Sequence, residues 1–379
     1  MSGEGIEPPM APEVAARRHG LRPGWTTGTC ASAAAKAAAI WLVEGVPPSQ
    51  VEVGLPSGKR VGFQVADIDS SHPYRAGVVK DAGDDPDVTH GAHLTAEVEW
   101  IGEPAADNLP DDAEDSSVAL HAGPGVGTVT LPGLGLPVGA PAINPVPARM
   151  IRSAVREVTS RPLRVTISVP GGEAMAAKTS NDRLGIVGGV SILGTTGIVR
   201  PFSTASWRAS VVQQIDVAVA QSLDHVVLST GGRTDAAAQR LLPDLPVMCF
   251  VEVGDFTGIA LRRAAAGGAK EVTFVGMAGK ITKLAAGVLM THYRRSKVDG
   301  ELLAEVALAC GAPAAVVESA TATATARHFA ETCMASGHTE ALVELCRRAA
   351  LVCSSYVRGA LRVEVIMVDF DGEEVIARG

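Results

Sequence analysis

The first half of the chain alternates hydrophobic and polar residues with a period of two. The alternation runs through 51–53, 61–65, 94–100 and 163–169, and glycine and proline separate these runs. Such alternation predicts β-strands with one buried face. Helical patterns near 29–43 and 145–158 accompany the strands. We therefore expect an α+β domain in which helices cover one face of a mainly antiparallel or mixed sheet.

The pattern changes near residue 203 to strands that alternate with helices. Apolar runs at 224–229, 247–253 and 271–276 are joined by helical patterns, and a further helix precedes them at 205–222. This βαβαβ order of continuous apolar strands predicts a parallel sheet buried on both faces, with ligands at the carboxyl ends of its strands. Helical patterns then dominate until a closing strand.

These patterns predict an α/β fold with an α+β part. The expected divisions are a flexible N-terminus (1–19), an N-terminal α+β sheet domain (20–200), a C-terminal Rossmann-like parallel α/β domain (201–360), and a closing strand and tail (361–379). A chain of 379 residues, of which 46% are hydrophobic and 20% charged, has enough apolar material for the cores of two domains.

Charge, aromatic content and cysteine spacing exclude several classes of protein. A net charge of −8 with 4% aromatic residues, and no dense Lys/Arg stripe, argues against nucleic-acid binding. The first 20 residues contain no apolar signal run, and no later run reaches membrane-spanning length, so we expect a cytoplasmic protein without a membrane partner. The six cysteines form no CxxC pair, which predicts reduced thiols and no protein-bound metal. Assembly into a homo-oligomer is left open.

A turn rich in threonine and glycine, within 25–36, runs directly into an alanine-rich helix. Residues 26–29 can leave backbone N–H groups free at the positive end of the helix dipole, and Lys36 lies about two turns into the helix. This arrangement predicts an anion-holding site. The alternative is that Thr29 or Ser32 simply caps a buried alanine helix.

The segment 80–90 packs four carboxylates beside Lys80 and His90. It resembles a divalent-cation loop only loosely, because the alternate-position ligands and the downstream Glu are missing. Three interpretations stay open, namely an ordinary Asp/Gly/Pro turn, a loop that contacts substrate, and a metal site. A second acidic stretch, 103–117, contains proline and is typical of a solvated loop insertion.

Glycine and threonine are dense from 171 to 200. So many glycines outside a helix imply that the backbone closely approaches either another segment of the protein or a ligand. The run 194–197 repeats the Thr/Gly character of 26–29. We therefore expect the two segments to form facing walls of one polar cleft.

A glycine pair follows the first strand of the second half. Thr230-Gly231-Gly232 lies where a Rossmann-like site needs close backbone approach, and Glu252 ends the next strand, where an acid can bind ribose hydroxyls. No full GxGxxG is present, so the loop suits a ligand without phosphates, such as S-adenosylmethionine, better than a dinucleotide. The alternative is a tight strand-to-helix turn. After Gly276, Lys280 and Lys283 share one helix face, where a polyanionic substrate can use both.

Five motifs occur in order along the chain. They are Trp25–Cys30, Lys80–Asp87, Leu184–Gly189, Ile192–Gly197, and Gly279-Lys280 with Thr291-His292. Together they resemble the cobalt-precorrin-5B C1-methyltransferases of anaerobic-type cobalamin biosynthesis. The resemblance extends from about residue 20 to the C-terminus, and it implies methyl transfer from S-adenosylmethionine to ring carbon C1 of cobalt-precorrin-5B, giving cobalt-precorrin-6A. The stretch Tyr293–Lys297 departs from the pattern, since relatives are expected to have a shorter, less basic link there.

The resemblance also implies roles for residues, because a macrocycle with many acetate and propionate arms needs several separated cations. The expected substrate-binding residues are Thr26, Thr27, Gly28, Thr29, Lys36, Lys80, Lys178, Arg183, Thr195, Thr196, Lys280 and Lys283. The expected cofactor-binding residues, for S-adenosylmethionine, are Thr230, Gly231, Gly232, Glu252 and Gly276. The expected catalytic residues, for a proton that must leave, are Asp81, Asp84 and His90.

No covalent nucleophile is implied, because the electron-rich tetrapyrrole supplies its own. Cys30 is accordingly expected to be a small buried thiol. Cobalt arrives within the substrate, so no metal bound by the protein is expected. The alternatives are an NAD(P)-dependent tetrapyrrole oxidoreductase, against which the missing GxGxxG counts, and a non-catalytic carrier of corrinoid intermediates.

Overall fold

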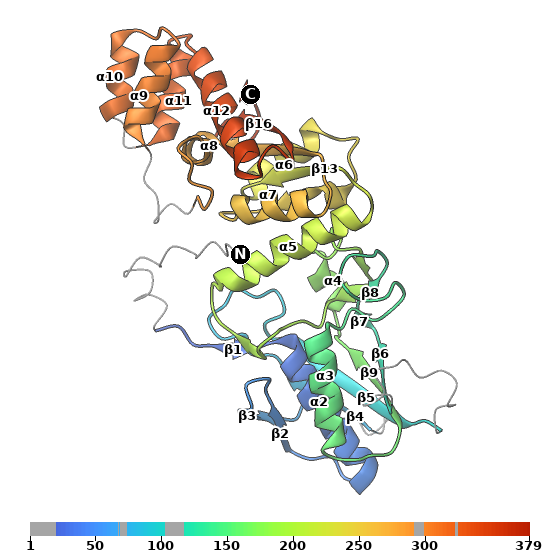
Figure 1. Cartoon of the computed structure of the whole chain (residues 1–379). Helices are drawn as coiled ribbons and strands as arrows, with labels where there is room; N and C mark the ends of the chain where they lie inside the picture. Colours follow the sequence, from blue (N-terminus) through green and yellow to red (C-terminus); the bar gives the residue numbers. More distant parts are fainter. Residues whose placement is uncertain (1–19, 67, 69–73, 103–116, 292–298, 323–324) are drawn as a thin grey trace. The chain divides into compact units, whose positions relative to one another are not determined.

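The computed structural model (Figure 1) describes residues 20–379 except 67, 69–73, 103–116, 292–298 and 323–324. The predicted flexible N-terminus, nearly all of the predicted 103–117 insertion and the basic stretch Tyr293–Lys297 lie outside the described residues. The chain divides between Ser203 and Thr204 into two compact units. In the part of the chain that is described, no helix is long and apolar enough to cross a membrane.

The first unit is built on a mixed four-stranded sheet with the order β4-β5-β9-β6. Its strands are β4 (Arg75–Val79), β5 (His93–Trp100), β6 (Val118–Ala122) and β9 (Leu163–Ser168). β5 pairs antiparallel with β4 and β9, whereas β6 pairs parallel with β9. Buried and less buried residues alternate along β9, because successive side chains of a strand point to opposite faces. The alternating pattern of the sequence thus corresponds to a sheet with one face in the core.

Two helices, α2 (Thr27–Glu44) and α3 (Pro145–Arg156), pack against each other, and α2 lies on β4 and β5. α2 consists largely of alanine, which has the highest helix propensity and a side chain small enough for close packing. Its N-cap Thr26 accepts a hydrogen bond from the Thr29 N–H, and Gly45 ends it in a left-handed conformation. Alanine therefore lets this helix lie buried against several elements at once.

Short strand pairs connect distant segments of the first unit. They are the hairpin β2 (Gln50–Gly54) and β3 (Arg60–Gln64), and the two-residue pairs β1 (Gly24–Trp25) with β12 (Ile198–Val199), β8 (Thr128–Val129) with β10 (Ile186–Val187), and β7 (Gly125–Val126) with β11 (Gly189–Val190). A short helix, α4 (Gly172–Ala176), packs on β7 and β11. The β1–β12 pair brings the start of the described chain to the end of the glycine-rich segment.

The second unit contains a five-stranded sheet with the order β14-β13-β15-β16-β17. Its strands are β13 (His225–Ser229), β14 (Phe250–Glu252), β15 (Glu271–Met277), β16 (Arg362–Val368) and β17 (Val375–Arg378). The first four are parallel and β17 is antiparallel. Because β14 and β15 lie on opposite sides of β13, the strand order reverses there. Ligands of open α/β sheets bind at the carboxyl ends of strands beside such a reversal.

Both faces of this sheet are covered, as the continuous apolar runs predict. Val227, Val275 and Ile366 join a core with α6 (Gly232–Leu241). Their neighbours Val226 and Leu228 face a larger core. That core is shared by α5 (Thr204–Ala220), α7 (Thr257–Ala266), α8 (Ala278–Ala285) and α12 (Glu340–Tyr356).

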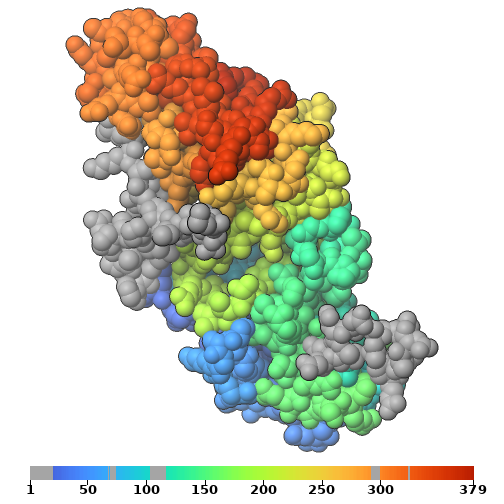
Figure 2. Space-filling model, viewed as in Figure 1, coloured from blue at the N-terminus to red at the C-terminus, as the bar shows by residue number. Residues whose placement is uncertain are grey.

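Three further helices extend the second unit beyond its sheet. They are α9 (Gly300–Ala309), α10 (Ala314–Ala322) and α11 (Ala326–Ala335). α11 packs on α8, and α9 packs on α12, while α9 and α10 also form part of the surface seen in Figure 2. Their contacts through α8 and α12 attach this helical group to the sheet.

One predicted strand is wrong over half of its length. Instead of a strand over 247–253, the structure has a 3-10 helix at Val247–Cys249 and a strand only at Phe250–Glu252. The preceding Pro246 accepts a hydrogen bond from the Cys249 N–H, which closes a turn in place of extended pairing. Apolar and β-branched residues are compatible with both conformations, so the periodicity did not reveal the turn.

Candidate functional site

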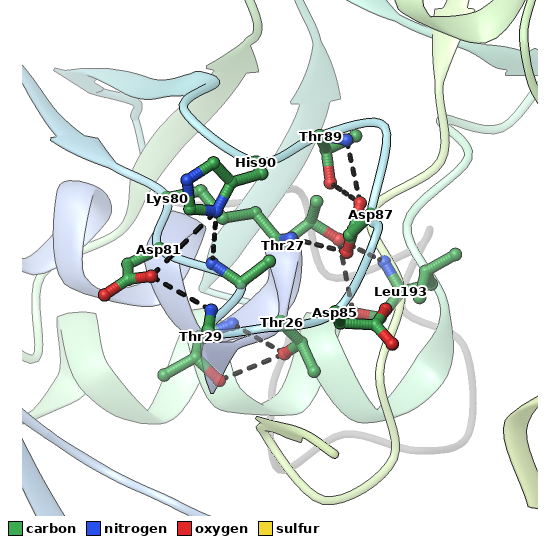
Figure 3. A network of polar contacts seen from close by, with 12 residues as sticks. Thr26, Thr27, Thr29, Lys80, Asp81, Asp85, Asp87, Thr89, His90 and Leu193 are labelled. Atoms are coloured by element: carbon green, nitrogen blue, oxygen red, sulfur yellow. Dashed lines mark hydrogen bonds and ion pairs between the residues drawn. The ribbon is translucent and has the colours of Figure 1, made fainter. Parts of the chain in front are cut away.

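The start of α2 is bound by another segment of its own unit (Figure 3). The Gly28 N–H donates to the Leu193 carbonyl oxygen at 3.2 Å, and the Leu193 N–H donates to Thr27 Oγ1 at 2.9 Å. Thr29 Oγ1 donates to the Gly197 carbonyl oxygen at 2.7 Å. Residues 26–29 therefore lie beside the predicted segment 194–197, and they are joined to it and to the adjoining Leu193 by direct hydrogen bonds. In the contacts of the described residues, Thr26 caps the helix, while Thr27 and Thr29 form hydrogen bonds with the backbone of Leu193 and Gly197.

The glycines of these two segments allow the same close packing. A Cβ on Gly28 would lie 2.7 Å from Pro147 Cγ, and one on Gly194 would lie 2.6 Å from Thr26 Cβ. Gly194 also has a φ of 126°, a conformation that other residues rarely adopt. The glycine-rich pattern of the sequence is compatible with either protein or a ligand beside these glycines. At Gly28 and Gly194 the neighbour is protein.

The acidic loop connects β4 to β5, and a buried ion pair lies inside it (Figure 3). Lys80 is only 1% exposed, and its Nζ lies 2.6 Å from Asp87 Oδ2. Asp87 Oδ1 accepts hydrogen bonds from the N–H and the hydroxyl of Thr89. Burial raises the pKa of Asp87, but Lys80 and the Thr89 bonds outweigh it and hold that pKa below its usual value. Lys80 thus stabilises the loop from within.

The other carboxylates of the loop also contact residues outside it. Arg22 forms a two-armed ion pair with Asp81, and its backbone N–H donates to Asp84 Oδ2 at 2.6 Å. Asp85 accepts from the Phe202 N–H at 2.8 Å. The hydrogen bond from Arg22, supported by the Gly83 N–H, lowers the pKa of Asp81 to about 2. A carboxylate with so low a pKa is a weak proton acceptor at neutral pH.

His90 lies at the end of the same loop with its side chain 53% exposed. Its Nδ1 accepts a hydrogen bond from the Ala82 N–H at 3.1 Å. The proton of the neutral ring must therefore be on Nε2. Nε2 is then a hydrogen-bond donor, and a hydrogen on Nδ1 would be incompatible with the Ala82 bond.

The remaining polar residues predicted for the first unit differ in their surroundings. Lys36 Nζ lies 2.5 Å from Glu157 Oε2 and also donates to the Glu52 carbonyl oxygen. Lys178, Thr195 and Thr196 are exposed, and Arg183 is partly buried. Cys30 is fully buried, and this burial raises the pKa of its thiol to about 12. Such a thiol is protonated and unreactive at neutral pH.

In the second unit, the loop after β13 is organised by Thr234. Thr234 Oγ1 accepts from the N–H groups of Thr230 and Gly231, at 2.9 and 3.1 Å, and donates to the Gly231 carbonyl oxygen. Behind this loop, Ser229 Oγ donates to Asp235 Oδ1 at 3.0 Å. The half-buried Glu252 ends β14 and pairs in register with Ser229. The predicted residues of this region therefore meet at one edge of the sheet.

Three glycines at this edge border open space. A Cβ on Gly231, Gly232 or Gly279 would meet no atom within 4 Å, apart from chain neighbours and local helix backbone. The φ of Gly231 is 166°, which any residue adopts, so backbone conformation does not require glycine there. Gly276 differs, because its Cβ would lie 2.6 Å from Phe274 Cε1. Packing explains Gly276 but not Gly231, Gly232 or Gly279.

The two predicted lysines of α8 meet a carboxylate that sequence analysis missed. Lys280 forms an ion pair with Asp255, which follows β14, and its Nζ lies 3.0 Å from Thr291 Oγ1. Lys283 Nζ donates to the Thr291 carbonyl oxygen at 3.1 Å. The available signal for Asp255 was its place just after a strand of the parallel sheet. The described residues contain no group of three or more His, Cys, Asp or Glu side chains that could hold a metal ion.

Comparison with known proteins gives consistent matches along the chain. The family model described as CbiD matches residues 14–201, and the model described as CbiD, C-terminal domain, matches 290–379. A cobalt-precorrin-5B C(1)-methyltransferase of Salinispora tropica is 56% identical over 98% of this chain and 96% of its own length. A relative of the same name from Thermus thermophilus is 47% identical over 95% of this chain and 94% of its own.

One solved structure also matches. It is a crystal structure of the cobalamin biosynthesis protein cbiD from Archaeoglobus fulgidus, with 30% sequence identity. The match covers 73% of this chain and 83% of that protein, with a TM-score of 0.39.

Proposed function

This chain belongs to the CbiD family, and from this membership we propose that it methylates C1 of cobalt-precorrin-5B with S-adenosylmethionine as methyl donor, giving cobalt-precorrin-6A. The observation that carries the proposal is the 56% identity to a curated C(1)-methyltransferase over 98% of the chain. The similarity includes both compact units, so it extends to every residue group discussed above. A biosynthetic reaction between small molecules also agrees with the predicted cytoplasmic location.

The reaction requires alignment and charge control more than covalent help from the protein. A π electron pair of the macrocycle forms the new C1–CH₃ bond, while the S–CH₃ bond breaks and its electrons stay on sulfur. The methylated macrocycle then loses a proton, which restores its charge. The protein must therefore hold C1, methyl and sulfur in line and receive a proton directly or through water.

We place the donor at the carboxyl edge of the second unit's sheet. The open space beside Gly231 and Gly232 supports this choice, because neither packing nor backbone conformation explains these glycines. Glu252, at the end of β14, is suited to accept hydrogen bonds from ribose hydroxyls. Thr230 positions the loop through Thr234, and Gly276 contributes by packing rather than by contact with the donor.

For the macrocycle, the exposed residues of the first unit are the better candidates. Lys178, Thr195 and Thr196 are accessible at the surface, whereas Lys80 is engaged inside the acidic loop. We also propose Lys36, Arg183 and residues 26–29 as substrate-binding residues, although Lys36 and residues 26–29 form contacts within the protein as well. Because cobalt is part of the substrate, the proposal needs no metal bound by the protein.

Among the three residues predicted for proton transfer, His90 has the most suitable exposure. In the tautomer that the Ala82 bond requires, its Nε2–H donates to a substrate carboxylate or carbonyl, and the departing proton goes to water rather than to His90. Asp81 and Asp84 are held by Arg22, so we propose that they shape the loop that presents His90. Transfer of the departing proton to water is compatible with this arrangement.

The test is methyl transfer by the purified chain from donor carrying a ¹³C-labelled methyl group to cobalt-precorrin-5B. We expect mass spectrometry to show one added methyl group and NMR to show that the labelled methyl group is attached to the quaternary carbon C1. S-adenosylhomocysteine should be the co-product. Transfer to another carbon, or none, would contradict the proposal. Oxidation or reduction of the macrocycle with a nicotinamide nucleotide would favour the oxidoreductase, and binding without any reaction would favour the carrier.

A further inference from the structure

A charged cluster at the carboxyl edge of the second unit has one positive charge in excess. Lys280 and Lys283 come from α8, and Asp255 comes from the loop after β14. Lys280 pairs with Asp255, while the Nζ of Lys283 contacts the uncharged Thr291 carbonyl oxygen. Among the residues that the structure describes here, two ammonium groups therefore face one carboxylate.

Burial makes this excess charge costly. Lys283 is 6% exposed, and the Thr291 carbonyl oxygen is the acceptor it contacts within the described part of the chain. Burial, followed by repulsion from Lys280, lowers the pKa of Lys283, and attraction to Asp255 only partly opposes this. A buried ammonium group is usually balanced by a hydrogen-bonded anion. Lys80 shows the balanced case, since it is also buried but lies directly against Asp87.

An anionic ligand would complete the cluster. Lys280 and Asp255 keep about a quarter of their side chains exposed, so the cluster reaches the surface. Gly279, next to Lys280, borders open space where a side chain would otherwise stand. Charge-assisted hydrogen bonds from two ammonium groups suit a carboxylate.

We propose that Lys280 and Lys283 together bind a carboxylate group of one of the two substrates. This inference rests on the proposed function, because both substrates then carry carboxylates. One source is the methionine part of the methyl donor, and the other is an acetate or propionate arm of the macrocycle. The shared chemistry is a single carboxylate that balances the excess charge.

The experiment compares the full-length chain with Lys283→Met, Lys280→Met and Asp255→Asn. Lys270→Met is the matched control, because Lys270 pairs with Asp224 at the opposite edge of the same sheet. Three probes are titrated, namely S-adenosylhomocysteine, 5′-methylthioadenosine, which lacks the amino-acid part, and uroporphyrin III, a polycarboxylate macrocycle. Thermal unfolding without ligand is recorded for each variant.

We expect Lys283→Met to weaken binding of one carboxylate probe about tenfold or more, with a smaller loss for Lys280→Met, because Lys280 is more exposed than Lys283. If S-adenosylhomocysteine is affected but 5′-methylthioadenosine is not, the carboxylate is that of the donor. If uroporphyrin III is affected, it is that of the macrocycle. Asp255→Asn should bind the same probe as tightly as wild type or more tightly, because it raises the net charge of the cluster.

A structural role would give the opposite result. Lys283→Met would then unfold at a lower temperature than wild type and bind every probe unchanged, whereas our proposal predicts an unliganded variant at least as stable as wild type. Equal losses in Lys283→Met and Lys270→Met would also overturn the proposal. If Lys283→Met does not fold, Lys280→Met and Asp255→Asn decide the question, because only Lys280→Met should weaken binding of the carboxylate probe, and a loss in both or in neither would overturn the proposal. Failure of the wild-type chain to transfer methyl would instead count against the proposed function.

Discussion

At the residue scale, the pair formed by Lys80 and Asp87 allows the clearest stability prediction. Lys80→Met removes the cation and leaves Asp87 with only its Thr89 bonds, so we expect the first unit to lose about 3 kcal/mol of unfolding free energy. Denaturant unfolding at pH 7 measures the loss. The exposed Lys59→Met is the control and should change stability by less than about 0.5 kcal/mol.

The pH dependence of this difference has a defined sign. Because the folded-state pKa of Asp87 is lowered, its contribution is complete above the unfolded pKa of about 4 and disappears as the pH falls through the folded value. The difference in unfolding free energy between wild type and Lys80→Met should therefore become smaller below pH 4. If this difference stays constant until the protein unfolds in acid, the charge of Asp87 is not the cause of the lost stability.

Single residues were also where sequence analysis had the least power. The sequence pattern indicated the polar segments 26–29 and 80–90 and the approach of 26–29 to 194–197, but it did not indicate which individual atoms their side chains contact. Arg22, the partner of Asp81, is 59 positions away in the chain, and no local pattern indicates that pairing. Lysine and aspartate residues that stabilise a fold are the same residue types that bind a substrate. Only the burial of Lys80 separates the two roles.

At the scale of elements, a substitution in the turn from β13 into α6 can change ligand binding without lowering stability. Gly232→Ala places a methyl group in open space at the start of α6, so we expect stability to stay equal or rise by up to about 1 kcal/mol. If the donor occupies that space, affinity for S-adenosylhomocysteine should fall about tenfold, as overpacking predicts. Titration calorimetry and thermal unfolding measure the two effects.

Gly276→Ala is the matched control at the end of β15. Its Cβ meets Phe274, so it should cost stability of about 1–3 kcal/mol. If Gly232→Ala binds S-adenosylhomocysteine as tightly as wild type, the donor does not bind beside Gly232 at this edge of the sheet.

Element prediction from the sequence succeeded where periodicity was long. The apolar runs that became β13 and β15 and the alternation of β5 and β9 each extend over at least five residues, enough to define a face. The two-residue strands β1, β7, β8 and β10–β12 are too short to produce any period. They form because distant segments meet, which is a property of the tertiary structure rather than of a local pattern.

At the scale of the whole molecule, the two units have separate cores. Every residue of the first unit's core lies between Cys30 and Ile192, and those of the second unit's cores lie between Val211 and Ala377. A unit with its own core can in principle fold alone. The residues proposed for the donor all belong to the second unit, whereas His90 and the exposed Lys178 belong to the first.

We therefore expect residues 204–379, produced alone, to unfold cooperatively and to bind S-adenosylhomocysteine with nearly the affinity of the whole chain. The same segment should transfer no methyl group, because Lys178, Thr195 and Thr196, which we propose to contact the macrocycle, belong to the first unit. Circular dichroism during thermal unfolding tests the fold, and titration calorimetry tests the binding. A segment that folds but does not bind would mean that the first unit supplies part of the donor site. Catalysis would then depend on the first unit for both substrates.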